Sequence, residues 1–420
     1  MEKFFKLNEK GSNVKTELIA GLTTFLAMAY ILGVNPAVLA DAGMDKASVF
    51  LATAISAGVA SIIMGLVANY PVALASGMGV NALFAYTICG QMGLSWAAAL
   101  SAVFISGVIF ILISVTGVRK AIINAIPVQL KLAIGAGIGF FIAFVGLKNA
   151  GIIVASPSTF VTIGNLTDPT VLLAIVGLLI TIALVIKNVP AAVFVGMVIT
   201  AVIGIILGFM GMAGMPTLPE HFISFDFELQ AAGACFSGIS ELFANPFQAF
   251  VVIFSFLFVD FFVAIGNRIG LINDKGELEN AEQALLADAV GTVFGAVLGT
   301  STVTSFVESS SGVGVGGRTG LTACTSGVCF LLAVFLSPLI LSTVTNAVTA
   351  PALIVVGIMM AQQLKGIDWD DMIFAAAGFV TVIMMILMYS ISNGIACGFI
   401  VYTIAMIAAG KAKEVHPTVW

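Results

Sequence analysis

The sequence predicts an all-α polytopic membrane protein whose fourteen transmembrane segments form a 7+7 inverted repeat. Of its 420 residues, 60% are hydrophobic and only 9% are charged, whereas about 25% of the residues in soluble domains are charged. A soluble fold cannot bury so much apolar surface. Basic residues gather in alternate loops, and a glycine- and serine-rich interruption occurs in each half of the chain. This composition excludes a water-soluble enzyme, a nucleic-acid-binding protein and a disordered chain.

Apolar runs of the roughly 20 residues that span a bilayer recur along the chain. The first half contains spans at 16–37, 48–68, 95–117, 121–147, 170–187 and 190–211, with a broken third element at 72–90. The second half contains spans at 244–267, 280–298, 319–340, 350–364, 371–390 and 393–410, with a broken tenth element at 301–316. A linker over 212–243, which carries acids but no lysine or arginine, separates the halves.

The distribution of basic residues supports this count through the positive-inside rule. With a cytoplasmic N-terminus, only Lys46 and Lys148 fall in outer loops, and Lys131 lies within a span. The inner loops and termini hold the other thirteen: Lys3, Lys6, Lys10, Lys15, Arg119, Lys120, Lys187, Arg268, Lys275, Arg318, Lys365, Lys411 and Lys413. We therefore expect both termini in the cytoplasm. The first 15 residues lack the apolar core and cleavage site of a signal peptide.

An odd number of elements per half means that the second half is inserted upside down, which is typical of transporters with inverted repeats. Glycine spacing gives weak additional support, although chance matches are expected among 44 glycines. The two series are Gly58, Gly65, Gly77 and Gly79, spaced 7, 12 and 2, and Gly291, Gly299, Gly312 and Gly314, spaced 8, 13 and 2.

The two broken elements are too polar and glycine-rich to be ordinary spans. Residues 71–81 read PVALASGMGVN and residues 300–312 read TSTVTSFVESSSG, so a β-prone run precedes Gly or Ser and then a short helical stretch. Irregular backbone inside a membrane must be buried in protein or line a wet cavity. Paired interruptions therefore predict a binding site at the membrane midplane, with free N–H groups at half-helix N-termini. The alternative is a pair of loops outside the membrane.

Three acidic residues lie well inside predicted spans: Asp260, Asp288 and Glu308. Each costs roughly 2.5–3.5 kcal/mol to insert at a helix centre, and such residues are functional candidates. Buried carboxylates can take up and release protons near neutral pH, so we predict that these three couple transport to protons. The alternatives are a structural ion pair with Lys131, or a brace from Asp288 to Arg318 or to a gap in the backbone.

Asn81, Phe306 and Ser309 complete the predicted substrate site with Glu308 and Asp260. The amide of Asn81 offers a donor and an acceptor to a substrate, or else satisfies the broken backbone. Phe306 would stack on a planar ligand, and Ser309 follows Glu308 directly. The five cysteines form no CxxC pair and the two histidines are isolated. We therefore expect no metal, no cofactor and no catalytic residues.

Several stretches resemble the adenine/guanine/hypoxanthine permease (AzgA-like) branch of the nucleobase:cation symporter-2 family, the nucleobase–ascorbate transporters. They are GLTTFLAMAYILGVNP (21–36), GMGVNALFAY (77–86), GAGIGFFIAFVGLKN (135–149), FLFVDFF (256–262), LLADAVGT (285–292), GTSTVTSFVESSS (299–311), GRTGLT (317–322) and TAPALIVVG (349–357). The resemblance covers nearly the whole chain.

The resemblance implies proton-coupled uptake of purine bases at the cell (inner) membrane, with alternating access and a homodimer. It implies a core domain (16–117 and 244–340) that moves against a gate domain (118–211 and 341–410). The remainder is a cytoplasmic N-terminal segment (1–15), an extracellular linker (212–243) and a cytoplasmic tail (411–420). Substrate positions of the family fall on Asp260 and Glu308, and positions tied to binding or coupling fall on Asn81 and Asp288.

The sequence departs from the family where helix 8 usually reads Asp-x-Phe-Asp-Thr-x-Gly-Thr. Val263 replaces the second aspartate, which leaves the choice of substrate and the proton coupling open. Ser76 stands where the family commonly has proline. We expect Glu308 and nearby backbone amides to bind one edge of a purine, while Asp260 binds the opposite edge or carries the coupling proton.

Three other functions are less well supported by the residues. An anion exchanger or channel of the same architecture would present a basic residue or bare helix dipoles to its ligand, rather than Asp260 and Glu308. A xanthine/uracil-type permease would share the family and differ in its substrate. A membrane-embedded aspartyl protease would need a Gly-x-Gly-Asp element, which is missing around Asp260 and Asp288.

Overall fold

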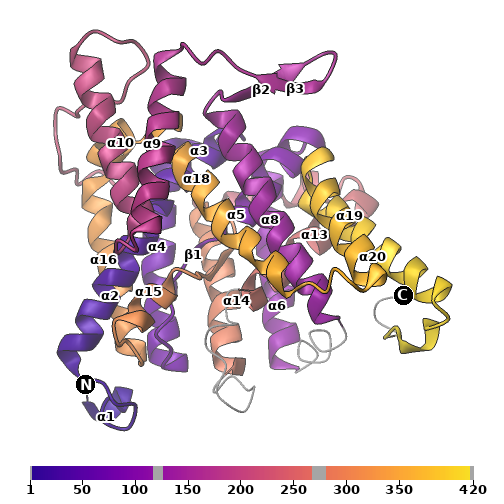
Figure 1. The fold of residues 1–420 in the computed structure, drawn as a ribbon. Helices are drawn as coiled ribbons and strands as arrows, with labels where there is room; N and C mark the ends of the chain where they lie inside the picture. The colour runs from indigo at the N-terminus through magenta and orange to yellow at the C-terminus, as the bar shows by residue number, and fades with distance from the viewer. Residues whose placement is uncertain (1, 117–125, 267–280, 417–420) are drawn as a thin grey trace.

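The computed structural model describes residues 2–116, 126–266 and 281–416; within these ranges, only the backbone is described for residues 261–266 and 281. Figure 1 shows a bundle of helices that surrounds a pair of short strands. The structure thus has the helical membrane architecture that the composition predicts. The ends of the predicted spans at 117, 121–125, 267 and 280, and Arg119, Lys120, Arg268 and Lys275, lie outside the described residues.

Every predicted span overlaps a helix. The first half contains α1 (Glu2–Phe5), α2 (Val14–Met28), α3 (Ile31–Ala40), α4 (Lys46–Ile63) with a π-helical turn at Met64–Ala68, α6 (Trp96–Val115), α8 (Val128–Asn149), α9 (Pro169–Ile186) and α10 (Ala192–Phe209). The second half contains α13 (Pro246–Gly266), α14 (Ala281–Leu298), α16 (Gly320–Ala333) continuing into α17 (Ser337–Thr343), α18 (Asn346–Ala361), α19 (Met372–Leu387) and α20 (Ile391–Ala408).

Within the described ranges, nine helical stretches are long and apolar enough to cross a membrane. Two shorter apolar stretches, Pro246–Asp260 and Met372–Leu387, lie in further predicted spans. The predicted linker contains two one-turn helices, α11 (Ala234–Ser237) and α12 (Ile239–Leu242). The chain is therefore a multi-pass helical membrane protein.

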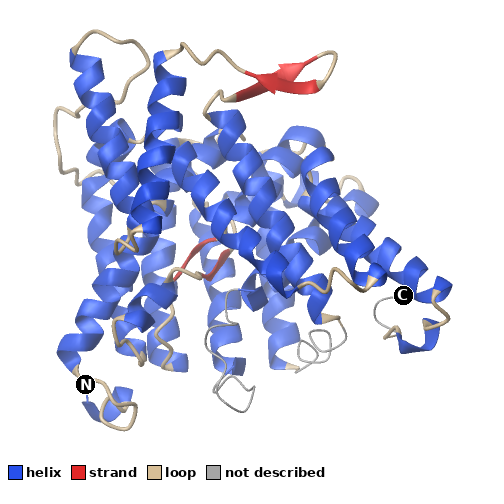
Figure 2. Ribbon diagram, in the orientation of Figure 1, coloured by secondary structure: helices blue, strands red, loops and turns tan. Residues whose placement is uncertain are grey.

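The two broken elements meet at the centre of the bundle. Strand β1 (Leu74–Ser76) is followed by α5 (Met78–Ala82) and a π-helical segment, Leu83–Gln91. Strand β4 (Val303–Ser305) is followed by α15 (Ser309–Gly314). Figure 2 shows these strands surrounded by helices, and all their residues are buried. The predicted interruptions are confirmed, and both lie buried within the bundle, which does not favour the alternative of two loops outside the membrane.

The strands pair because a broken backbone inside a membrane needs partners within the protein. They run antiparallel, with Ala75 opposite Thr304. The pairing extends beyond the strands, since the Gly77 amide donates to the Thr302 carbonyl at 3.0 Å. The Phe306 amide likewise donates to the Ala73 carbonyl at 3.1 Å. This crossing fixes the positions from which both short helices begin.

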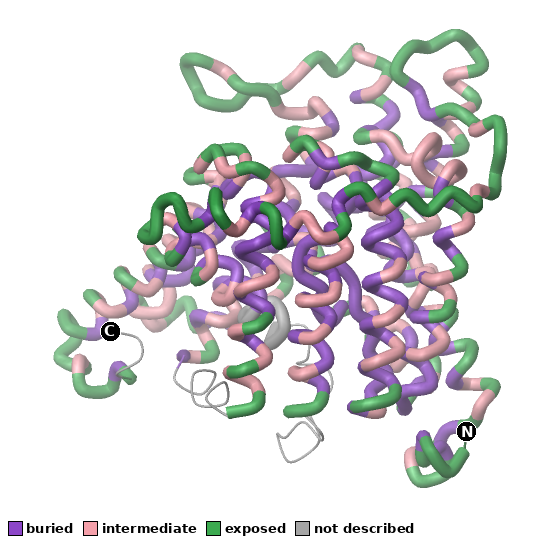
Figure 3. Tube along the Cα trace, turned by 180° about the vertical axis from the view of Figure 1, so that it is seen from behind, coloured by how far each residue is buried: buried purple, intermediate pink, exposed green. Residues whose placement is uncertain are grey.

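Glycines let the helices around the crossing approach closely. A side chain at Gly58 of α4 would meet Leu331 and the Gly327 carbonyl of α16. Gly65 and Gly320 each face the backbone carbonyl of the other. Small residues allow this kind of backbone contact between membrane helices. Figure 3 shows that buried residues gather in the interior of the bundle, while exposed ones follow its outer faces.

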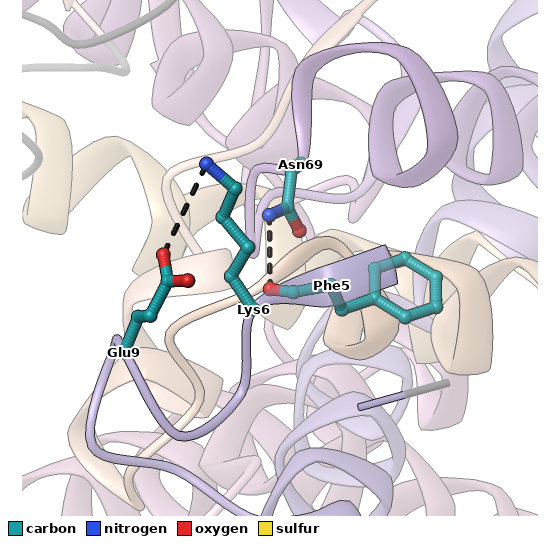
Figure 4. A network of polar contacts seen from close by, with 4 residues as sticks. All are labelled: Phe5, Lys6, Glu9 and Asn69. Atoms are coloured by element: carbon teal, nitrogen blue, oxygen red, sulfur yellow. Dashed lines mark hydrogen bonds and ion pairs between the residues drawn. The ribbon is translucent and has the colours of Figure 1, made fainter. Parts of the chain in front are cut away.

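Two features lie outside the sequence prediction. Strands β2 (Ile153–Ser156) and β3 (Phe160–Ile163) form an exposed antiparallel hairpin after α8. At the opposite end of the bundle, the N-terminal segment packs the buried Phe5 and Leu7 on Leu321. Figure 4 shows the Phe5 carbonyl accepting from the Asn69 amide, at 3.0 Å, beside an exposed Lys6–Glu9 ion pair. The N-terminal segment is thus docked against the bundle.

Candidate functional site

Glu308 lies at the start of α15, directly after the strand crossing. Its carboxylate oxygen Oε1 accepts a hydrogen bond of 2.5 Å from the hydroxyl of Tyr30. Tyr30 is fully buried at the junction of α2 and α3, whereas Glu308 is partly exposed. A bond from a hydroxyl to a carboxylate is short and strong because the acceptor is charged. The structure thus fixes the orientation of one predicted site residue through a partner that sequence analysis did not identify.

The first amides of α15 are already engaged. The Ser309 N–H donates to the Phe306 carbonyl at 3.2 Å, and the Ser310 N–H donates to the Val307 carbonyl at 2.9 Å. The Ser309 hydroxyl accepts from the Ala73 amide at 3.1 Å, which ties α15 to the crossing. The sequence predicts that backbone amides near Glu308 bind ligand. Since these two are occupied, the carboxylate is the better candidate.

The two aspartates lie against strand β4. Asp260 of α13 and Asp288 of α14 are both buried. The Ser305 hydroxyl donates to Asp288 Oδ1 at 2.9 Å. The Thr292 hydroxyl donates to the Val303 carbonyl at 3.0 Å, and its oxygen lies 3.5 Å from Asp260 Oδ2. Both carboxylates are therefore positioned by the second broken element or by a residue bound to it.

Among the structural alternatives for Asp288, a brace on the broken backbone fits the hydrogen bond that Ser305 of β4 donates to its carboxylate, whereas a brace to Arg318 is not seen in the described contacts. The guanidinium of Arg318 donates to the carbonyls of Val313 and Gly317, at 2.6 and 2.8 Å. Within the described residues, the one ion pair joins Lys6 to Glu9, so a pair between Lys131 and Asp260 or Asp288 is not observed there. The side chain of Val263, where the family has a second aspartate, lies outside the described part of α13.

Asn81 lies in α5 and lines a small cavity. Its Oδ1 accepts from the Ser301 hydroxyl, while its Nδ2 is buried and has no partner among the described groups. The cavity of about 10 Å³ has roughly the room that one water molecule needs. Its other lining residues are Val34, Val38, Met78, Ala82, Ile142, Val145 and Leu353. Asn81 is thus the one polar residue among those that line this space, between α3 and α5 on one side and α8 and α18 on the other.

Neither Glu308 nor Asp260 lines that cavity. The described hydrogen bonds give them different partners, Tyr30 and Thr292. Phe306 is buried next to the crossing, where its backbone pairs with Ala73. The structure therefore brings the predicted residues to one region around β1 and β4, on four different elements.

A second polar group lies where the π-helical segment after α5 approaches α8 and α19. We call Asp41, Tyr86, Lys148, Asn149 and Tyr389 the tyrosine cluster. The Tyr86 hydroxyl donates to Asp41 Oδ2 at 2.8 Å and accepts from the Asn149 amide at 3.2 Å. The Lys148 ammonium lies 5.1 and 5.2 Å from the ring centres of Tyr86 and Tyr389. Cations are attracted to aromatic faces at such distances.

No group of three or more His, Cys, Asp or Glu side chains in the described residues could hold a metal ion. The residues at the crossing are instead carboxylates, hydroxyls and one amide. Such groups can form hydrogen bonds to a neutral polar ligand and can exchange protons. This chemistry suits reversible binding.

Comparison with known proteins identifies the family. The model of the xanthine/uracil permease family, described as "Permease family", matches residues 15–397. The chain is 49% identical to the guanine/hypoxanthine permease PbuG of Bacillus subtilis, across 100% of this chain and 97% of that protein. It is 43% identical to the adenine permease AdeP of Escherichia coli, across 100% of this chain and 93% of that protein.

The fold also occurs among solved structures. The transmembrane domain of a cyanobacterium bicarbonate transporter, BicA, superposes with a TM-score of 0.66. The match covers 92% of this chain and 97% of that domain, at 16% sequence identity. At this identity the likeness concerns the fold alone. By sequence, the chain belongs to the xanthine/uracil permease family, in its branch of adenine, guanine and hypoxanthine permeases, and is not an enzyme.

Proposed function

We propose that this protein imports purine nucleobases (hypoxanthine, guanine and adenine) by proton symport across the cell's inner membrane. Full-length similarity to named guanine/hypoxanthine and adenine permeases supports the substrate class. The observation that carries the proposal is the central crossing, where β1 and β4 pair inside the bundle and the carboxyl side chains of Glu308, Asp260 and Asp288 gather around the second broken element.

Recognition would rest on the carboxylates and on apolar walls. Glu308 is an acceptor for the ring N–H of a purine, and Asp260 binds the opposite edge or carries the proton. Burial of the flat ring contributes about 25 cal/mol per Å² of apolar surface. Selectivity comes from the polar groups, because a buried donor or acceptor left unpaired costs about 1–3 kcal/mol. Asn81, Phe306 and Ser309 are the further substrate contacts, and Asp288 is a further coupling residue.

The packing of the helices supports a 7+7 inverted repeat. If each element of the first half corresponds to the element seven places later, α2, α4 and α6 correspond to α13, α14 and α16. The contact of α4 with α16 then corresponds to that of α14 with α6, and both pairs pack together. The contacts of α2 with α16 and of α13 with α6 form a second matching pair. Strand β1 packs on α4 as β4 packs on α14.

The remaining helices follow the same rule. Helix α9 packs on α10, and their counterparts α19 and α20 pack together as well. Helix α9 also packs on α18, and the counterparts of that pair, α19 and α8, pack together. These helices belong to the gate domain (118–211 and 341–410), while those that surround the crossing belong to the core domain (16–117 and 244–340). The cavity at Asn81 and the tyrosine cluster both lie where the two groups meet. Alternating access follows if core and gate rock about this boundary.

The orientation in the membrane follows from the basic residues. Figure 1 places α1 at the bottom of the view and the β2–β3 hairpin at the top, which fits a cytoplasmic N-terminal segment (1–15). We expect a cytoplasmic tail (411–420) and an outer linker (212–243) as well. The family resemblance further leads us to expect a homodimer in the membrane. Cross-linking of the protein in native membranes tests that expectation through the mass of the product.

The test is uptake into proteoliposomes that contain the purified protein. Radiolabelled hypoxanthine, guanine, adenine and bicarbonate are supplied in turn, with and without an inward proton gradient. We expect uptake of one or more purines that rises with the gradient, and no uptake of bicarbonate. Glu308→Gln should lose purine uptake, while the same change at the exposed Glu228 should leave it intact.

Each outcome bears on a separate part of the proposal. Bicarbonate uptake without purine uptake would replace the proposal with an anion exchanger. Purine uptake at the same rate with and without the proton gradient would contradict proton coupling but would still support purines as the substrate. Purine uptake by Glu308→Gln at the wild-type rate would remove Glu308 from the site.

A further inference from the structure

Tyr30 is a buried polar group that the transport proposal does not yet use. It lies between α2 and α3, with no exposed surface, in a stretch that is otherwise apolar. A buried tyrosine hydroxyl usually has a hydrogen-bond partner. Its partner here is the carboxylate of Glu308, which is 278 residues away in the chain and 2.5 Å away in space. The contact therefore joins the first transmembrane segment to the second broken element.

The close approach of α15 to α2 depends on a glycine. A side chain at Gly312 would collide with the Thr24 hydroxyl and the Ala20 carbonyl of α2. Residues four apart share a helix face, so Glu308, which precedes α15 directly, faces the same helix as Gly312. The absence of a side chain at Gly312 thus allows the Glu308 carboxylate to reach Tyr30.

The Tyr30 hydroxyl occupies only one of the two carboxylate oxygens. It bonds to Oε1, and each carboxylate oxygen has two acceptor sites. Among the described residues, no second side chain donates to Glu308. Glu308 as a residue is partly exposed, and Oε2 has no side-chain donor among the described residues, so it can accept from a ligand while Oε1 is held.

We propose that Tyr30 is a positioning residue for purine recognition: its hydroxyl fixes the rotamer of Glu308 so that Oε2 is presented to the ring N–H of the base. This inference rests on the proposed function. A fixed acceptor binds more tightly than a mobile one because less side-chain freedom is lost on binding. Tyr30 itself does not touch the purine.

The test begins without substrate. Infrared difference spectra of wild type against Glu308→Gln identify the carboxyl band of Glu308. The same band in Tyr30→Phe should lie at a different frequency, because the variant lacks only the donating oxygen. Tyr402→Phe, which removes the oxygen of another buried tyrosine in α20, should leave the band in place. An unchanged band in Tyr30→Phe overturns the positioning contact, whether or not the protein transports purines.

The second measurement is calorimetric titration of the detergent-purified protein with hypoxanthine. We expect Tyr30→Phe to weaken binding about tenfold relative to wild type and Tyr402→Phe to change it less than twofold. In uptake assays, the loss should appear in KM and not in the maximal rate. Wild-type affinity in Tyr30→Phe overturns the proposal.

A double-mutant comparison separates positioning from direct contact. If Tyr30 acts through Glu308, Tyr30→Phe should cost almost nothing in a Glu308→Ala background. An equal loss in both backgrounds contradicts the positioning role. If Glu308→Ala leaves no measurable binding, the frequency shift together with the KM-specific loss decides the matter. Failure of wild type to bind any purine would overturn the proposed function, and with it the purine role of Tyr30.

Discussion

Glu17 is a fully buried acid that sequence analysis left unassigned because it lies at the edge of a predicted span. Its Oε1 accepts from the Arg318 amide at 2.9 Å, and its Oε2 accepts from the Thr319 amide and the Thr322 hydroxyl, at 3.3 and 2.5 Å. The two amides come directly before Gly320, where α16 begins, and Thr322 lies in its first turn; amides at a helix N-terminus have no partner within the helix. The carboxylate thus caps α16 where the helix dipole favours negative charge.

Glu17→Gln should therefore destabilise the protein. An amide can accept only through its oxygen, and its NH₂ group would face donors that need an acceptor. We expect a loss of about 1–3 kcal/mol in the free energy of unfolding, seen as a lower unfolding temperature of the detergent-purified protein. Glu2→Gln makes the same change at an exposed residue of α1 and should have no effect. Equal unfolding temperatures for the two variants would contradict the capping role.

Individual residues show what the sequence could and could not predict. Asp260, Asp288 and Glu308 stood out because charges are rare inside membrane spans, and the structure places all three around one crossing. Tyr30 gave no such signal, because a tyrosine in an apolar helix is ordinary and its partner lies 278 residues away. Contacts over such separations follow from the fold, and hydropathy does not reveal them.

At the scale of elements, Glu241 repeats the arrangement of Glu17. It lies in α12, and the Ser95 amide and hydroxyl donate to its Oε1 and Oε2, at 2.8 and 2.5 Å. Ser95 is the N-cap of α6. Thus Glu17 binds the N-terminal end of α16, and Glu241 binds the N-terminal end of α6, which is the counterpart of α16 in the proposed repeat. This correspondence supports the inverted repeat independently of the glycine spacing.

The cap at α6 should depend on pH. The Ser95 hydroxyl, and then the Ser95 amide, lower the pKa of Glu241 from its usual value. A lowered pKa in the folded state stabilises the protein above the pKa of the unfolded chain, near 4.3, and this contribution disappears as the pH falls through the folded value. The unfolding temperature of wild type should therefore exceed that of Glu241→Gln at about pH 7, with the difference vanishing near about pH 3.

Thermal unfolding of both proteins across that pH range checks this prediction. Glu228→Gln, an exposed change in the same linker, is the control. A difference between wild type and Glu241→Gln that stays constant with pH would show that the charge of Glu241 is not involved.

The elements that carry the tyrosine cluster belong to the two domains that we expect to move. Next to the cluster, the Gln91 amide lies 3.4 Å from the Met388 carbonyl, and both residues are exposed.

A bifunctional thiol reagent should therefore join Gln91→Cys to Met388→Cys once the five native cysteines are replaced. The cross-linked protein should lose purine uptake, and a reducible linker should restore it. Each single-cysteine variant should keep its uptake under the same treatment. Full uptake with the link in place would mean that these elements do not separate during transport.

The broken elements show what could be predicted from the sequence and what could not. Their β-prone runs followed by Gly or Ser predicted the interruptions, and the strands lie where expected. The glycine correspondence fails in detail, because Gly77 directly follows β1 whereas Gly312 lies inside α15. The β2–β3 hairpin also escaped prediction. Its β-branched residues around a Ser-Pro-Ser turn were a usable signal, although the segment lacks the long apolar run that marks a membrane span.

For the whole molecule, the membrane explains why so much of the helix order was predictable. A span must be long, apolar and helical, so residue composition alone marks its bounds to within a few residues. Which helices pack together is harder to predict from sequence, because a close contact such as that of Gly58 with Gly327 can be recognised only when the positions of both helices are known. The site shares this difficulty. The presence of the candidate carboxylates inside the bundle was predictable, whereas the tyrosine, threonine and serine groups that contact them were not.

Binding of a purine at the crossing of β1 and β4 is the central feature of the proposed mechanism. An experimental structure of the protein with bound hypoxanthine tests this directly. We predict density for the base beside the Glu308 carboxylate, between α15 on one side and α13 with Asp260 on the other. Density at a position that touches neither Glu308 nor Asp260 would contradict the account.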